Sequence, residues 1–251
     1  MNRIHTLVVG GTRGIGRALV RLFCSEGHLV SVIGRHQPDS ADQVLPGARH
    51  WTVDMRDERR LGAALKDIIR RRGKLSRLVF LQRYRGGDGE DAWAGEIELA
   101  LTATKNIIER LIPHFDESAE RAIVIVGSPA GDFIASERDL GYHVAKAGQN
   151  QLMRYYAAVL APYGIRVNGV SPATVLKEES KSFYAKNRRL RDFYRRITPL
   201  GRMGTAEDVA ETIAFLCGPK AAFITGQNIF VDGGLSLLWQ ESIVRKHAPP
   251  K

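Results

Sequence analysis

The sequence predicts an α/β fold, with one doubly wound, mainly parallel sheet of seven strands, helices on both faces, and residues 1–251 in a single domain. Short apolar runs alternate with segments of helical spacing, which is typical of βαβ units and therefore of a parallel sheet. A glycine-rich turn joins the first apolar run to the first helical segment. Hydrophobic residues make up 44% of the chain, enough to fill the core of such a fold.

Strands are expected where short apolar runs end at glycine or at polar residues. The seven expected strands are residues 6–10, 29–34, 50–53, 77–81, 122–126, 165–170 and 228–231. Apolar residues recur every three or four positions in residues 15–26, 58–71, 99–111 and 142–160, which predicts helices there. Residues 86–95 and 173–196 are expected to be irregular or mobile, and the polar tail over residues 240–251 is expected to fray.

Composition and charge exclude several classes of protein. The net charge is +10, but the basic residues are dispersed and no nucleic-acid motif organises them, so we expect a solvated surface or an anionic ligand. The first apolar run is too short for a signal peptide, and no stretch approaches the roughly 20 apolar residues of a membrane span. Cys24 and Cys217 form neither a disulfide framework nor a metal-ligand spacing. We therefore expect a cytoplasmic protein without a metal site.

The glycine-rich turn, with the sequence GGTRGIG at residues 10–16, predicts a dinucleotide site of the Rossmann type. Glycine permits a tight turn and lets the backbone approach a pyrophosphate, and the following helix offers free N–H groups to it. A glycine triplet alone is weak evidence, because turns use glycine anyway. Here the triplet lies between a strand and a helix, where the mechanism requires it.

The end of the second strand favours NADP(H) over NAD(H). An acidic residue about 20 positions after the glycine turn would bond a free ribose 2′-hydroxyl. Arg35 follows the strand instead, and no acid comes before Asp39. A guanidinium offers charge and a planar fork of donors to a 2′-phosphate, and Arg13 is placed to join it. The alternative is that Arg35 is an ordinary exposed arginine.

With these motifs in place, the sequence resembles the short-chain dehydrogenase/reductase family, of the classical type. The turn is similar to the family's TGxxxGIG element, and Asp54 to its adenine-contacting aspartate. Ser128 and the later segment YHVAK, residues 142–146, resemble the catalytic serine and the YxxxK motif. Residues 165–172 resemble the IRVNxVxPG strand, and residues 199–234 the C-terminal third. The ordered set covers almost the whole chain and is specific.

The resemblance implies an NADPH-dependent oxidoreductase that transfers a hydride between nicotinamide and a ketone or alcohol. Tyr142 would be the acid/base, and Ser128 would bond the substrate oxygen. Lys146 shares a helix face with Tyr142, so its ammonium should lower the pKa of the phenol. The implied cofactor contacts are Gly10, Thr12, Arg13, Gly14, Ile15, Gly16, Arg35, Asp54, Met55, Tyr142, Lys146, Pro172, Ala173 and Val175.

Two segments depart from the family pattern. Residues 80–83, FLQR, stand where the family has NNAG, so the bulky Gln82 and Arg83 should reshape the loop beside the adenosine half of the cofactor. The asparagine of the catalytic tetrad should fall near Ala100, where no asparagine is present. Asn106 lies on another face of the same helix and is not a replacement.

Residues 177–196 correspond to the family's substrate lid. The segment carries eight Lys or Arg residues and three acids, with aromatic residues between them. One interpretation is a lid that recognises an anionic or phosphopantetheine- or nucleotide-linked substrate. The other is an amphipathic lid helix with a solvated basic face. The sequence does not name the substrate.

The leading hypothesis is a carbonyl reductase or alcohol dehydrogenase that uses NADPH. The departures motivate an alternative, a non-catalytic dinucleotide-binding sensor or partner subunit, although the retained Ser128, Tyr142 and Lys146 argue against it. A basic nucleic-acid-binding module is disfavoured. The resemblance also implies a homotetramer or homodimer, with the helix at residues 142–160 as a candidate interface.

Overall fold

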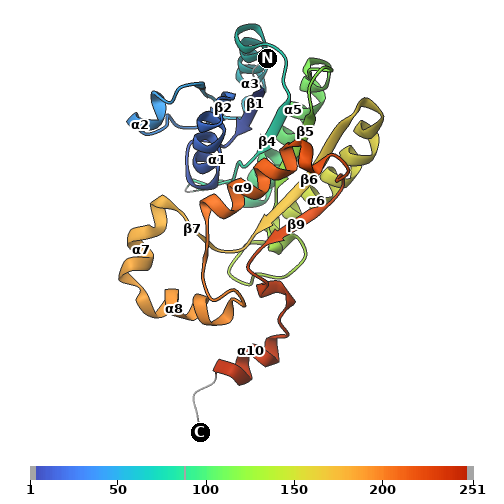
Figure 1. The fold of residues 1–251 in the computed structure, drawn as a ribbon. Helices are drawn as coiled ribbons and strands as arrows, with labels where there is room; N and C mark the ends of the chain where they lie inside the picture. Colours follow the sequence, from blue (N-terminus) through green and yellow to red (C-terminus); the bar gives the residue numbers. More distant parts are fainter. Residues whose placement is uncertain (1–3, 88, 248–251) are drawn as a thin grey trace.

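The computed structural model, which describes residues 4–87 and 89–247, contains the expected seven-stranded sheet (Figure 1). All seven strands are parallel, in the order β3-β2-β1-β4-β5-β6-β9. Their bounds are β1 His5–Val9, β2 Leu29–Gly34, β3 Ala48–Thr52, β4 Arg77–Phe80, β5 Arg121–Val126, β6 Ile165–Pro172 and β9 Asn228–Val231. The predicted doubly wound α/β fold is confirmed.

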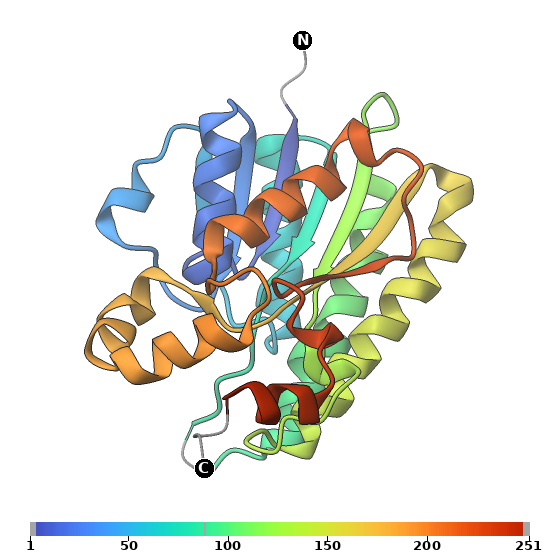
Figure 2. The ribbon, with the colours of Figure 1, turned by 60° about the horizontal axis from the view of Figure 1, so that its bottom comes forward.

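Helices cover both faces of the sheet (Figures 1 and 2). One face carries α1 (Gly14–Ser25) and α9 (Ala206–Cys217), and the other carries α3 (Glu58–Arg72), α5 (Ala103–Leu111) and α6 (Leu140–Leu160). Alternate strand residues point to opposite faces, so Leu7 and Val9 join the core under α3 and α5 whereas Val8 joins the core under α1 and α9. This is why the strands appear in the sequence as continuous apolar runs.

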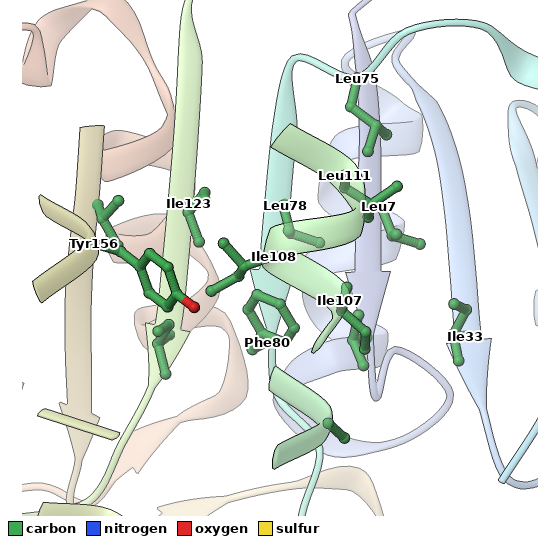
Figure 3. Close-up of a cluster of buried hydrophobic side chains, with 14 of the residues drawn as sticks. Leu7, Ile33, Leu75, Leu78, Phe80, Ile107, Ile108, Leu111, Ile123 and Tyr156 are labelled. Atoms are coloured by element: carbon green, nitrogen blue, oxygen red, sulfur yellow. The ribbon is translucent and has the colours of Figure 1, made fainter. Parts of the chain in front are cut away.

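The core under α3, α5 and α6 is shown in Figure 3. Leu7 from β1, Leu78 from β4 and Ile123 from β5 meet Ile107 and Ile108 from α5, and all five side chains are fully buried. Burial of each such side chain contributes about 1.5–3 kcal/mol. The resulting rigid layer fixes the carboxyl ends of the strands, where the loops that form the cavity begin.

Helix α9 was missed by the helical-spacing analysis, although the sequence marks its start. The Thr205 hydroxyl accepts a hydrogen bond from the Asp208 amide at 3.2 Å, and the Asp208 carboxylate accepts one from the Thr205 amide at 2.7 Å. This reciprocal capping box is readable as a Thr followed three residues later by an acid. Thr205 also belongs to β8 (Gly204–Thr205), which pairs with β7 (Val175–Leu176) in a small second sheet.

The expectation that residues 173–196 are irregular was wrong for most of the segment. After β7 come a 3-10 turn, Glu178–Ser180, and the helices α7 (Lys181–Lys186) and α8 (Arg188–Ile197). An aromatic contact links the two helices, because Tyr184 of α7 packs edge-on against Tyr194 of α8. Figure 2 shows α7 and α8 beside the carboxyl ends of the strands.

Three further helical segments lie where irregular chain or another geometry was expected. Helix α4 (Ala92–Ile97) begins inside the segment 86–95, because the Asp91 carboxylate caps it by accepting from the Trp93 amide at 2.9 Å. A π-helical turn, Glu98–Thr102, precedes α5. The tail forms α10 (Gln240–His247), and residues 248–251 lie outside the described part. The short α2 (Ser40–Gln43) follows β2. No described helix is both long and apolar enough to cross a membrane.

Candidate active site

A cavity of about 810 Å³ opens at the carboxyl ends of the strands. It is lined by the segments that follow β1 and β4, the two strands between which the strand order reverses, and this is where doubly wound folds bind ligands. Every residue that the sequence nominated for the cofactor or for catalysis lines it: Gly10, Thr12, Arg13, Gly14, Ile15, Gly16, Arg35, Asp54, Met55, Ser128, Tyr142, Lys146, Pro172, Ala173 and Val175. The structure therefore gathers the whole nominated set around one cavity.

The glycine turn is held tightly between the loop after β4 and helix α1. Gly10 has φ of +86° and Gly14 has φ of +54°, conformations that favour glycine. A Cβ on Gly10 would lie 2.6 Å from the backbone nitrogen of Gln82, and one on Gly16 would lie 2.3 Å from the Gly10 carbonyl oxygen. Only glycine fits at these two positions, and the backbone is left open to the cavity.

A carboxylate from the lid lies against the N-terminus of α1. The Gly14 amide donates a hydrogen bond to Glu179 Oε1 at 3.0 Å, and the buried Arg17 forms ion pairs with Glu179 and Glu178. We call Arg17, Glu178 and Glu179 the lid latch. The Glu179 carboxylate shows that the Gly14 amide can donate to an anion, so the turn fits a dinucleotide pyrophosphate. No sequence pattern links residues so far apart, and the latch was not predicted.

Arg13, after β1, and Arg35, after β2, line the cavity, and both are exposed. No carboxylate among the described residues forms an ion pair with either of them. Asp54 is bonded to the backbone amide and the guanidinium of Arg56, both at 3.0 Å, and the guanidinium holds the pKa of this carboxyl below its ordinary value. Arg35 is close enough to Asp54 to lower that pKa further.

The segment after β6 carries Lys177 over the glycine turn. Pro172 ends β6 and Ala173 follows it, and Val175 is buried where β7 pairs with β8. The Lys177 side chain lies 3.1 Å from the position that a Cβ on Gly14 would take. Burial lowers the pKa of Lys177, and the nearby Arg83, Arg85 and Arg138 lower it further. All four cations line the same cavity.

Ser128, which follows β5, and Tyr142 and Lys146 on α6 line the other end of the cavity. Lys146 Nζ lies 5.7 Å from the centroid of the Tyr142 ring, as expected for residues one helical turn apart. Lys146 is buried, which lowers its pKa to about 8, and Glu96 offsets this only in part. Ser128 caps a short turn, since its hydroxyl oxygen accepts from the Ala130 amide at 3.2 Å. The hydroxyl hydrogen stays free to donate into the cavity.

The loop before α6 brings a further cation to Tyr142. The Arg138 guanidinium carbon lies 5.5 Å from the centroid of the Tyr142 ring. His143 holds this loop in place, because its Nε2 accepts from the Ala135 amide at 2.9 Å and its Nδ1 lies 3.0 Å from the Asp139 carbonyl oxygen. His143 thus has a structural role in this loop.

The two segments that depart from the family pattern meet in one buried network. Gln82 Nε2 donates to Thr104 Oγ1 at 2.7 Å, and Thr104 Oγ1 donates to the Ala100 carbonyl oxygen at 2.8 Å. Gln149 Nε2 reaches the same carbonyl oxygen at 3.4 Å, and Gln149 Oε1 accepts from Lys146 Nζ at 2.8 Å. Gln149 belongs to none of the predicted motifs, although its position three residues after Lys146 on one helix is a signal that could have indicated it.

The basic residues of the lid face away from the cavity for the most part. All eight lie in the described part of the chain, and Lys177 alone lines the cavity. The others lie on α7 and α8, where all but the half-buried Arg191 are exposed. This supports the interpretation of an amphipathic lid with a solvated basic face.

Known proteins match the chain over nearly its full length. A family model described as enoyl-(acyl carrier protein) reductase matches residues 9–236. The 3-oxoacyl-(acyl-carrier-protein) reductase FabG of Staphylococcus aureus is 29% identical over 245 residues, which span 91% of this chain and 96% of that protein. An uncharacterized oxidoreductase of Schizosaccharomyces pombe is 29% identical over 239 residues, 91% of this chain and 89% of that protein. A solved short-chain dehydrogenase/reductase from Serratia marcescens has a TM-score of 0.79 at 26% identity and covers 93% of this chain and 98% of that one.

Proposed function

Because the chain belongs to the short-chain dehydrogenase/reductase family, we propose that it is an NADPH-dependent carbonyl reductase, and an alcohol dehydrogenase in reverse, in which Tyr142 carries the proton. The family makes the protein an NAD(P)-dependent oxidoreductase, and the choice of cofactor, substrate and proton carrier is our proposal. One observation carries it: Ser128, Tyr142 and the buried Lys146 line the same cavity as the glycine turn.

The bound nicotinamide would supply or accept the hydride. Tyr142 would donate its phenolic proton to the carbonyl oxygen during reduction and would take it back during oxidation. The Lys146 ammonium, 5.7 Å from the ring centroid, would stabilise the phenolate that forms. Ser128 would donate its free hydroxyl hydrogen to the same substrate oxygen and so orient it between the two groups.

The preference for NADPH is supported by Arg35 and Arg13. Both are exposed, line the cavity and have no ion-pair partner in the described chain, so their charge is available to a 2′-phosphate. A 2′-phosphate needs charged donors at this place, whereas a free 2′-hydroxyl needs an acceptor. The pyrophosphate would lie between the N-terminus of α1 and the Lys177 side chain.

Three arginines that lie outside the lid segment, residues 177–196, support an anionic substrate. Arg83 and Arg85 from the loop after β4, and Arg138 beside Tyr142, line the cavity without a carboxylate partner among the described residues. We infer that the carbonyl substrate carries a carboxylate or phosphate. The kcat/KM for dihydroxyacetone phosphate should exceed the kcat/KM for dihydroxyacetone. Arg138→Gln should reduce the ratio of these two values. Equal rates for the two would overturn this inference and leave the reductase proposal intact.

The reductase proposal is tested by NADPH oxidation with a panel of ketones, together with Tyr142→Phe. The variant should bind NADPH as tightly as wild type by fluorescence titration but should lose about 10²–10⁴-fold in kcat, the typical contribution of general acid catalysis. Full activity in Tyr142→Phe would refute the mechanism. NADPH binding without turnover of any ketone would favour the alternative, a non-catalytic sensor or partner subunit, and failure to bind NADPH would refute both.

We also infer a homodimer or homotetramer in the cytoplasm. Tyr155 and Val159 on α6 are 57% and 39% exposed, an apolar strip on the helix that the sequence nominated as an interface. Cys24 and Cys217 are both free, which fits a reducing compartment. Light scattering tests the oligomer, with a monomer at micromolar concentration as the contrary result, and imaging of a tagged chain tests the compartment.

A further inference from the structure

The Lys146 ammonium makes its shortest hydrogen bond to a residue outside every motif of the sequence analysis. Its Nζ donates to Gln149 Oε1 at 2.8 Å and to the Val126 carbonyl oxygen at 3.4 Å. Gln149 is 1% exposed and Lys146 is 5% exposed. A neutral side-chain oxygen therefore holds this buried cation from the protein side, away from the cavity.

Gln149 is itself anchored at its other end by the π-helical turn. The Ala103 amide bonds the Glu98 carbonyl oxygen five residues back, and the Ala100 carbonyl oxygen accepts from Gln149 Nε2 at 3.4 Å. Gly148 permits the close approach of α6, because a Cβ there would lie 2.9 Å from the Leu101 side chain. Widened π-helical turns are frequent at functional sites, and this one directs a carbonyl at the helix that carries Lys146.

We propose that Gln149 is a positioning residue: its carboxamide holds the Lys146 ammonium beside Tyr142 and ties it to the Ala100 carbonyl, the place where the family pattern has asparagine. The role in catalysis rests on the proposed reductase function. A carboxamide suits this role because its oxygen accepts from the ammonium while its NH₂ group donates to the carbonyl. Both partners fix its orientation, so the ammonium cannot move without breaking a buried hydrogen bond.

The charge of residue 149 should also set the pH at which Lys146 titrates. The charged or titratable groups facing Lys146 are Tyr142 on α6, Glu96 on α4 and Arg83 on the loop after β4. Burial lowers the pKa of Lys146 to about 8, and Arg83 acts in the same direction while Glu96 opposes it. The neutral Gln149 adds a hydrogen bond but no opposite charge.

Two substitutions move this titration in opposite directions. Lys146 is an ammonium below its pKa, so the reductase rate should fall as the pH rises through about 8. Gln149→Glu places a carboxylate at bonding distance and should move this fall upward by about 1 pH unit or more. Gln149→Met keeps the volume but removes the acceptor, so the fall should move to lower pH and kcat should drop about tenfold. KM should change little in either variant, because residue 149 does not line the cavity.

Gln151→Glu is the matched control, since Gln151 lies on the same helix but is exposed and bonded to Arg154. It should leave the pH profile of wild type unchanged. A second readout needs neither cofactor nor turnover: the ¹³Cε resonance of Lys146, assigned with Lys146→Arg, is titrated by NMR. Its midpoint should lie near pH 8, higher in Gln149→Glu and lower in Gln149→Met.

Identical Lys146 midpoints in wild type, Gln149→Glu and Gln149→Met would overturn the positioning role. If the midpoints shift as expected while no ketone is reduced, the positioning of Lys146 stands and the reductase proposal fails. Circular dichroism melts identify a variant that does not fold. In that event the other substitution still decides the question, because each makes its own directional prediction.

Discussion

The two ends of the cavity are built in different ways. At one end, which we propose binds the phosphates and call the phosphate end, the seven contiguous residues 10–16 supply the turn, and all of them but Gly11 line the cavity. At the proton-transfer end, Lys146 depends on Gln149 from its own helix and, through the Ala100 carbonyl, on Thr104 and Gln82. A backbone site requires particular residues at fixed spacing. A side-chain network can exchange its members and remain connected.

The largest expected effect on cofactor binding is at the phosphate end, from Gly16→Ala. The added Cβ would meet the Gly10 carbonyl oxygen at 2.3 Å and the Gly11 Cα at 2.9 Å. Both are backbone atoms, so α1 must move away from the turn. Overpacking of this kind costs about 1–3 kcal/mol of stability. NADPH affinity should fall about 100-fold or more, measured by fluorescence titration, because several aligned N–H groups are displaced together.

Gly27→Ala is the control at the other end of α1. Gly27 has φ of +80°, but a Cβ there would have no neighbour within 4 Å. The substitution should cost about 1–2 kcal/mol through backbone strain alone and should leave NADPH affinity unchanged. A comparable loss of affinity in both variants would show that affinity follows stability of α1 and not the shape of the turn.

This contrast explains which features could be predicted from sequence. The seven strands follow from local apolar runs, and the glycine turn from local spacing, so both were located before the structure. Gln149 and Glu179 act through partners on other elements, Ala100 and Gly14, and one segment alone does not show such pairs. The absence of asparagine near residue 100 is readable from one segment, but the side chain that takes its place, Gln149, is not.

Arg35→Gln should weaken NADPH binding about tenfold, the next largest effect. Hydrogen bonds to charged groups contribute about 1.5–3 kcal/mol, and the exposure of Arg35 places the loss at the lower end of that range. NADH affinity should stay the same, since NADH has no 2′-phosphate. Parallel titrations with the two cofactors provide the measurement. Equal loss for both cofactors would assign Arg35 to a contact other than the phosphate.

At the proton-transfer end, Thr104→Val should reduce kcat by only a few-fold, because the other hydrogen bonds of the network remain in place. The substitution keeps the shape but removes the hydroxyl that bridges Gln82 Nε2 and the Ala100 carbonyl oxygen. Stability should fall by about 1–3 kcal/mol, since both groups are buried. Gln149 still contacts the carbonyl, so Lys146 stays in place.

Thr212→Val on α9 is the matched control for that variant. Its hydroxyl donates to the carbonyl oxygen four residues back, at 3.0 Å, as the Thr104 hydroxyl does at 2.8 Å. The control should lose some stability in a thermal melt but should keep the kcat of wild type, because Thr212 does not line the cavity or join the network. Equal kcat in the two variants would show that Thr104 matters for folding and not for the site.

The smallest expected effect has the opposite sign, from Glu179→Gln in the lid latch. The Glu179 carboxylate lies on the Gly14 amide, where the proposed pyrophosphate would bind, so it competes with a ligand of like charge. Neutralising it should tighten NADPH binding about threefold at low salt, and the gain should shrink at high salt as screening increases. Glu178→Gln is the control, because Glu178 pairs with Arg17 and Arg21 but does not bond Gly14. Weaker binding in Glu179→Gln than in Glu178→Gln would mean that the Glu179 carboxylate helps to hold the cofactor under the lid. The phosphate end would then depend on side chains from a distant element, as the proton-transfer end does.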